Sequence, residues 1–414
     1  MRGVIRLWIS LISCSLLLSG CWDYTEYEQI EQVSAIGVDY APRTREITST
    51  IQYIPTEKGS MSAGGQSGGA SAGTVQAVHS AKGTSFYEAL SKVQRVVPKR
   101  LFFGYANCLI FGEDVAKNIM LDMVELHNRT PLVRDSISLV ISSGKASETI
   151  STVDSIMTAS SSQEIMDLIN LSETTGAAYP VSLQDFCAML AIPGLEPTAP
   201  LIHTVSKEPK VDAQGGTDRD AAYDVVRIGD QKVAGLAAFN GDKLVGYLNP
   251  KESLGLSWIT RKKIRAYEVT KLSPGQDTRD ALYFRVAKSK SNIKVKLVDG
   301  KPRIQIDVSV LAELRKYYGA TSGEFLAPQK IRVMEQKLCD SIRSDIQAAL
   351  NRGQKELKTD IFGFGFSLFR EHPQLWRTKY EGNWKKLFPT LPVEIKVKAN
   401  VKSTGTNLRG LELK

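Results

Sequence analysis

The chain has 414 residues and a formal net charge of +9, with 42% hydrophobic and 23% charged residues, as in ordinary globular proteins. This length predicts two or three domains. The basic residues are spread along the chain and form no arginine-rich tract interleaved with aromatics, which argues against a nucleic-acid-binding protein.

The first 21 residues have the pattern of an exported lipoprotein precursor. Two arginines form a positive head, and the apolar run at 7–18 is shorter than the roughly 20 residues that a membrane-spanning helix needs. Leu18-Ser19-Gly20-Cys21 then resembles the bacterial lipobox, in which the peptide is cut between Gly20 and Cys21 and the thiol takes a diacylglycerol. Residues 1–20 are therefore expected to be a lipoprotein signal peptide.

Cys21 is the expected lipid-attachment residue, carrying S-diacylglycerol and N-acyl groups. Several acyl chains on one residue are enough for stable anchoring, whereas a single chain would bind only marginally. The alternative is an uncleaved signal anchor with an incidental cysteine. The charged head, the short apolar run and the small residues before Cys21 together favour the lipoprotein. Everything after Cys21 is then expected outside the cytoplasmic membrane.

The first half of the mature chain mixes strand and helix patterns. Alternation predicts a hairpin with strands at 33–39 and 46–53, followed by a flexible Gly- and Ser-rich loop at 59–73. Ser85-Phe86-Tyr87-Glu88 is a capping box that opens a helix. Further along, the pattern predicts a strand at 101–111, a helix from 113, a strand at 136–142 and helices over 145–191.

The second half is richer in strands. Strands are predicted at 224–228, 233–239 and 244–248, the last two joined by the hairpin turn Asn240-Gly241. Asp299-Gly300 turns another hairpin, and a long helix follows Pro328, with an apolar stripe from Ile331 to Ala349. Gly353 marks the end of this helix or a kink in it, and alternation predicts a final strand at 393–402.

These elements predict an α+β fold with mixed or antiparallel sheets and flanking helices. Proline and glycine at 193–200 mark a boundary. The expected division is an N-terminal α+β domain at 21–200, a small β-rich middle domain at 201–277, and a C-terminal α+β domain with the long helix at 278–414.

Three motifs together resemble a known family. They are Cys21-Trp22-Asp23 behind the lipobox, the strand Val33-Ser-Ala-Ile-Gly-Val-Asp39, and Asp360-Ile-Phe-Gly-Phe-Gly365. The chain is similar to the Ger(x)C family, the lipoprotein C subunits of bacterial spore nutrient-germinant receptors. The resemblance covers nearly the whole mature chain. It implies a receptor subunit on the outer face of the spore's inner membrane, with polytopic A and B subunits as partners.

Residue chemistry gives no support for an enzyme. The four histidines lack metal-ligand spacing, and no phosphate loop or dinucleotide fingerprint occurs, so no catalytic residue, metal or cofactor is expected. Asp360 is interpreted as a helix cap or turn residue, and Trp376 and Trp384 as core or interface anchors rather than sugar platforms. Cys108, Cys187 and Cys339 are expected to be free thiols, although one bridge among them stays open.

The function that this resemblance implies is a lipid-anchored C subunit that supports receptor assembly or signalling in spore germination. The alternative is a solute-binding lipoprotein of a membrane transporter, which calls for two lobes of repeated βα units. The β-rich end of the chain argues against it. A cell-surface hydrolase would need a catalytic set that the sequence does not offer.

Overall fold

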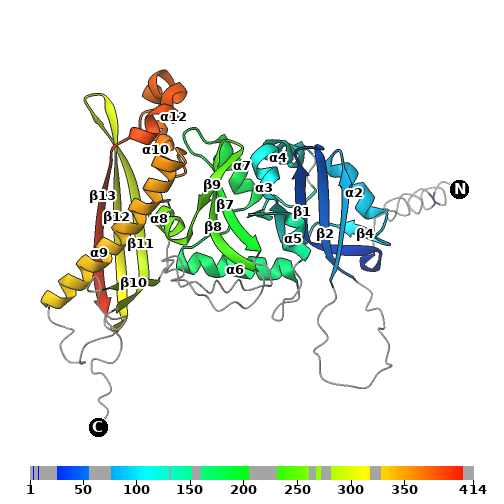
Figure 1. Ribbon diagram of the computed structural model, residues 1–414, viewed down its shortest axis with the longest axis horizontal. Coiled ribbons are helices and arrows are strands. Elements are labelled where there is room, and N and C mark those ends of the chain that lie inside the picture. Colours follow the sequence, from blue (N-terminus) through cyan, green and yellow to red (C-terminus); the bar gives the residue numbers. More distant parts are fainter. Residues whose placement is uncertain are drawn as a thin grey trace, which may run out of the picture.

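A computed structural model describes residues 26–55, 76–129, 132–151, 160–204, 231–260, 267–271, 281–317 and 328–403, together with Gly3 and Trp8. The described residues form two β-sheets with helices packed against them (Figure 1), so the predicted α+β class is confirmed. The loop predicted at 59–73 and the strand predicted at 224–228 lie outside the described residues.

The larger sheet has nine strands in the described part of the chain. Their order is β3-β2-β1-β5-β6-β7-β8-β9, and β4 pairs with the beginning of β1. The neighbours β1, β5, β6 and β7 are parallel, while the hairpin partners at both ends are antiparallel. The bounds are β1 (Ile30–Ala41), β2 (Glu46–Ile54), β3 (Ala77–Gly83), β4 (Arg100–Phe102), β5 (Cys108–Phe111), β6 (Ser138–Ser142), β7 (Thr198–Thr204), β8 (Gln231–Asn240) and β9 (Lys243–Leu248).

Helices cover both faces of this sheet, which is why residues 33–39 of β1 are buried without interruption. Ile36 and Val38 belong to the core under one helical layer, and Ala35 belongs to the core under the other. The first layer contains α2 (Phe86–Gln94), α3 (Glu113–Asn118), α4 (Met120–Arg129) and α7 (Leu183–Ala191). The second contains α5 (Ala146–Ser151) and α6 (Ser161–Thr175).

The predicted strand at 101–111 is wrong as one element. It is divided into β4 and β5, with a turn between them closed by the hydrogen bond from Ala106 N to Phe103 O. The helix predicted from 113 is likewise two helices, because Ile119 takes a non-helical φ of −131° between α3 and α4. At the capping box, the Ser85 hydroxyl accepts from Glu88 N as predicted, but the Glu88 carboxylate accepts from Thr84 instead of Ser85.

The second sheet contains the C-terminal strands in the order β10-β11-β12-β13. The Asp299-Gly300 turn is confirmed, with positive φ at both residues. The final strand runs parallel to β12 because α9 connects the two along one face (Figure 1). The bounds are β10 (Tyr267–Lys271), β11 (Ala281–Val298), β12 (Lys301–Tyr317), α9 (Pro328–Leu350) and β13 (Val393–Ser403).

The apolar stripe predicted for the long helix faces this sheet. Leu338, Ile342, Ile346 and Ala349 are completely buried in α9. The helix continues into a π-helical turn, Asn351–Glu356, that contains Gly353. A Cβ at Gly353 would lie 2.8 Å from the ring of Phe362, so a glycine is required where the regular helix ends.

Another helix, α8 (Pro250–Thr260), joins the two sheets. It contacts β8 on one side and α9 on the other. At Gly255 the two helices meet backbone to backbone, since a Cβ there would lie 2.0 Å from the Asp345 carbonyl oxygen. Between α9 and β13 the chain forms short helices that include α10 (Phe364–Glu371), α11 (Pro373–Leu375) and α12 (Trp384–Leu387), and α10 contacts β11.

The boundary predicted near residue 200 falls inside the larger sheet. β7 pairs with β6 from the first predicted domain and with β8 from the second. The strands of 21–200 and 201–277 are therefore hydrogen-bonded into one sheet, and the division into three domains stays a prediction.

Candidate functional site

The predicted anchor site, Gly20 and Cys21, lies outside the described residues, which resume at Glu26. Lipid attachment and cleavage therefore stay predictions. In the described part of the chain, no helix is both long enough and apolar enough to cross a membrane.

The motif that begins at Asp360 forms the most densely bonded site of the C-terminal half. Asp360 is fully buried at the start of α10. Its carboxylate accepts hydrogen bonds from Phe364 N at 3.1 Å and Gly365 N at 2.8 Å. These N–H groups belong to the first turn of α10 and have no acceptor within the helix. The carboxylate also accepts from Trp384 Nε1 at 2.9 Å. The interpretation of Asp360 as a cap is confirmed, and Trp384 is a third donor that the sequence did not predict.

The electrostatics of Asp360 fit a structural role. Burial raises the pKa of its carboxyl to about 6, against the opposing effect of the donors from Gly365, Phe364 and Trp384. Such a pKa is also found in general acids and bases. Here, however, Asp360 is 3% exposed and its carboxylate already accepts from three protein donors, Phe364 N, Gly365 N and Trp384 Nε1. These bonds hold the carboxylate in place at the start of α10.

Beside Asp360, the backbone at Gly365 packs directly against the backbone at Gly194, which is far away in the sequence. A Cβ at Gly365 would lie 2.8 Å from the Cα of Gly194, which itself has φ +73°. Phe366 N donates to Gly194 O and Glu196 N donates to Asp360 O, both at 3.0 Å. We call Gly194, Asp360, Gly365, Trp376 and Trp384 the Asp360 junction.

The two tryptophans close the Asp360 junction. Trp376 and Trp384 are 2% and 4% exposed, with ring centroids 5.4 Å apart. Rings this deeply buried cannot stack on a sugar, so their interpretation as core anchors is confirmed. Trp376 differs in one respect: its Nε1 has no hydrogen-bond partner among the described residues.

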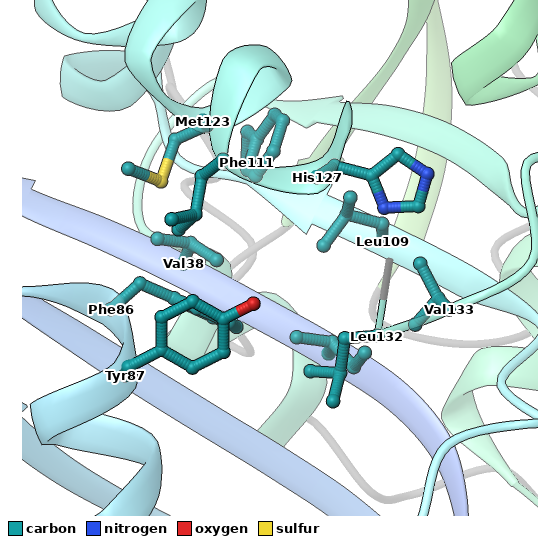
Figure 2. A pocket seen from close by; sticks show the side chains of 11 residues that line it. Val38, Phe86, Tyr87, Leu109, Phe111, Met123, His127, Leu132 and Val133 are labelled. Atoms are coloured by element: carbon teal, nitrogen blue, oxygen red, sulfur yellow. The ribbon is translucent and has the colours of Figure 1, made fainter. Parts of the chain in front are cut away.

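The first helical layer contains a small apolar pocket, between α2 and α4 and above β1 and β5 (Figure 2). Its cavity volume is about 40 Å³, far below the roughly 300–1,000 Å³ of ordinary ligand sites. It can accept a group the size of a small apolar side chain, not a nutrient-sized solute or an acyl chain. The lining residues are Ile36, Val38, Phe86, Tyr87, Leu109, Phe111, Met123, Leu126, His127, Leu132 and Val133.

His127 and Tyr87 supply the polar atoms of this pocket (Figure 2). His127 Nε2 is already engaged, 2.9 Å from Asp135 Oδ1. Sequence periodicity placed Phe86 and Met123 on apolar helix faces. It could not show that the two helices leave a gap, because the distance between them depends on the sheet below.

The remaining reactive side chains are dispersed. Among the residues that the structure describes, no three His, Cys, Asp or Glu side chains form a group that could hold a metal ion. Cys108, Cys187 and Cys339 are free thiols, as the sequence favoured, and none is bridged to another. Burial raises the pKa of Cys108 to about 12, which makes it an inert core residue.

Two family models match the chain in consecutive segments. The model described as spore germination protein N-terminal domain matches residues 23–204. The model described as spore germination B3/GerAC like, C-terminal, matches residues 234–405.

Individual relatives match along nearly their whole length. Spore germination protein KC of Bacillus subtilis (strain 168) is 26% identical over 396 residues, covering 94% of this chain and 93% of the relative. Spore germination protein B3 of the same organism is 22% identical over 393 residues, covering 94% and 96%. Spore germination protein GerQC of Bacillus cereus is 21% identical over 402 residues, covering 95% and 98%.

One solved structure shares the fold. The crystal structure of the GerBC protein matches with a TM-score of 0.52 and 16% sequence identity, over 88% of this chain and 96% of that one.

Proposed function

Because this chain belongs to the Ger(x)C family, we propose that it is the C subunit of a nutrient germinant receptor in bacterial spores. The observation that carries the proposal is the pair of family matches, which follow one another at 23–204 and 234–405. Relatives named as spore germination proteins extend the similarity over more than nine-tenths of the chain.

In this proposal the mature chain begins at Cys21 and is held on the outer face of the spore's inner membrane by its lipid. The lipobox supports the anchor through its chemistry: a thiol nucleophile preceded by small residues after a short apolar run. The polytopic A and B subunits of the same receptor are the proposed partners, and the proposed role is receptor assembly or signal transfer. That the chain catalyses no reaction stays a prediction.

The anchor is tested by Cys21→Ala, with Cys14→Ala as the matched control. Cys14 lies inside the apolar run, whereas Cys21 follows the small residues Ser19 and Gly20 that come after it. Mass spectrometry of the mature N-terminus should find acyl groups on Cys21 in the parent chain and in Cys14→Ala, and no lipid in Cys21→Ala. A mature chain that begins elsewhere, or an unmodified Cys21, would refute the anchor.

The receptor assignment is tested separately in spores. Deletion of the gene should abolish or slow germination in response to at least one nutrient, and the parent chain should co-purify with polytopic membrane proteins of the same receptor. A deletion strain without redundant paralogues that answers every nutrient normally would refute the assignment.

The alternative, a solute-binding lipoprotein, predicts a cleft large enough for a solute. The pocket between α2 and α4, of about 40 Å³, is too small for such a solute. The antiparallel pairings of β10, β11 and β12 also differ from the repeated βα units that this alternative calls for. Calorimetric titration of the full chain with nutrient mixtures separates the two, since the alternative requires saturable binding by this chain alone.

A further inference from the structure

Large apolar side chains gather on the surface around β4. Tyr27, Val96, Phe102 and Tyr105 are 56%, 63%, 43% and 58% exposed. Phe102 and Tyr105 are in edge-to-face contact, with ring centroids 5.6 Å apart. We call these four residues the aromatic tip. An exposed aromatic pair with further large apolar side chains at the same end of the sheet is typical of an interaction site.

The fold brings the four residues to the same end of the sheet. In the β1–β4 pairing, Ile30 lies opposite Arg100 and Gln32 opposite Phe102, and Tyr27 precedes Ile30 by three residues. Val96 joins them because the Gln94 side chain bonds both Lys99 O and Leu101 N, which holds the loop after α2 against β4. β4 and α2 lie at the N-terminal end of the molecule, away from the four-stranded sheet (Figure 1).

The backbone is arranged to keep these rings outside. The turn between β4 and β5 takes Tyr105 out of the sheet, while Leu101 and Phe103 point into the core. The Phe102 ring lies over Gly104, where a Cβ would come within 2.7 Å of it. A side chain at Gly104 would displace the ring, so the surface is built around this glycine.

The short distance along the chain from Cys21 to Tyr27 indicates which surface the aromatic tip faces. Five residues lie between Cys21 and Tyr27, so even a fully extended chain spans at most roughly 20 Å from one Cα to the other. If Cys21 carries the proposed lipid, the tip is held beside the headgroups of the bilayer. Tyrosine is enriched at such an interface because its ring has an apolar body and a polar hydroxyl, and the aromatic tip contains two tyrosines, Tyr27 and Tyr105.

We propose that the aromatic tip docks into the headgroup region of the membrane that holds the lipid anchor. This inference rests on the proposed anchoring and adds a second, protein-based contact, which fixes the orientation of the chain on the bilayer.

Charge has a minor part in this contact. Charges of both signs flank the aromatic tip: Arg95 and Arg100 are exposed, as are Glu26 and Glu28. Lys99 lies 3.9 Å from Glu31 and is paired with it. Docking is therefore expected to depend on ring burial and to be insensitive to salt, whereas an attraction that depended on charge would weaken with salt.

The test places a fluorescent reporter on the tip of the full lipidated chain. Tyr105→Trp is reconstituted into phosphatidylcholine vesicles whose acyl chains carry bromine near the headgroup end, and its emission is compared with that of the parent chain. The control is Val333→Trp, at an exposed position on α9, the helix that packs against the four-stranded sheet. The fluorescence that each new tryptophan adds to that of the parent chain is the quantity compared. Bromine should quench most of this added fluorescence in Tyr105→Trp, at low and at high salt, and none of it in Val333→Trp. Val96→Trp repeats the measurement if Tyr105→Trp does not fold.

The outcomes separate the docking from the anchor. Vesicle-bound chain with acylated Cys21 but an unquenched reporter would overturn the docking and leave the anchor standing. Capture of the same surface by a partner subunit, seen as cross-linking of residue 105 to that subunit without lipid quenching, would overturn it as well. Chain that does not float with vesicles and has an unmodified Cys21 would refute the anchor, and with it the basis of the docking.

Discussion

The hydrogen bond from Trp384 to Asp360 gives a stability prediction with an internal control. Trp384→Phe removes the Nε1 donor that is 2.9 Å from the carboxylate and keeps an aromatic ring in the core. Trp376→Phe makes the same chemical change at a neighbouring buried ring whose Nε1 has no partner among the described residues. Both variants lose similar ring area, so the difference between them isolates the hydrogen bond.

The expected magnitude follows from the charge on Asp360. A hydrogen bond to a charged group contributes about 2 kcal/mol, and one to a neutral group about 1 kcal/mol. Trp384→Phe should therefore lower the free energy of unfolding by about 2 kcal/mol more than Trp376→Phe at about pH 8, where the carboxyl is ionised. At about pH 5 the carboxyl is protonated in the folded chain, and the excess should shrink to about 1 kcal/mol.

The parent chain has its own pH dependence from the same residue. Burial raises the pKa of Asp360 from its ordinary 3.8 to about 6, so the folded state binds this proton more tightly than the unfolded state. Stability from this residue is therefore greatest below about pH 4 and falls by about 3 kcal/mol in total as pH rises through about 6.

Urea denaturation of the three chains across this pH range measures both effects. Equal losses for Trp384→Phe and Trp376→Phe at every pH would refute the assignment of a charged hydrogen bond at the Asp360 junction. A difference that grows as pH falls would reverse the sign of the reasoning.

Three further substitutions test other parts of the structure. Gly255→Ala places a Cβ 2.0 Å from the Asp345 carbonyl oxygen and should cost about 3 kcal/mol in denaturation, and a neutral result would contradict the close helix crossing. Gln52→Leu removes a buried amide that bonds side chains on two other elements, Ser34 and Ser161, so a loss of about 2 kcal/mol in thermal unfolding is expected, and unchanged stability would contradict it. Leu338→Asp buries an unpaired charge in α9 and should unfold the C-terminal sheet with loss of germination in complemented spores. The exposed Val333→Asp on the same helix should preserve both, and equal behaviour of the two would contradict the packing.

Much of the fold follows from local patterns in the sequence. Hairpins with explicit turn residues, such as Asp299-Gly300, and the periodic stripe of α9 were predicted because their cause is local. α8 was missed because it is enclosed by other elements, with Ser253, Gly255 and Ser257 buried, and so has no polar face to reveal a period. β3 was missed because its short and polar residues at the sheet edge show no apolar alternation.

The candidate sites divide in the same way. The cap role of Asp360 was predictable, since an acid before a Gly-rich helix start has a local use. Its hydrogen bond to Trp384 was not predictable, because the indole belongs to α12, 24 residues further along the chain. The pocket and the aromatic tip depend on distances between elements, which local patterns do not reveal. The sequence predicted one continuous strand at 101–111, and so it did not predict the turn between β4 and β5 that exposes Tyr105.

The contacts that join the two sheets have a mechanical consequence. Gly194 meets Gly365 and Gly255 meets α9 at backbone distance, and Thr359 Oγ1 donates to Phe239 O in the neighbouring sheet. A domain hinge needs loops that can absorb changes in backbone angle, and these close contacts resist such a change where the two sheets meet. A force applied at the end beside β4 is therefore expected to move the sheet that contains β13 together with the larger sheet.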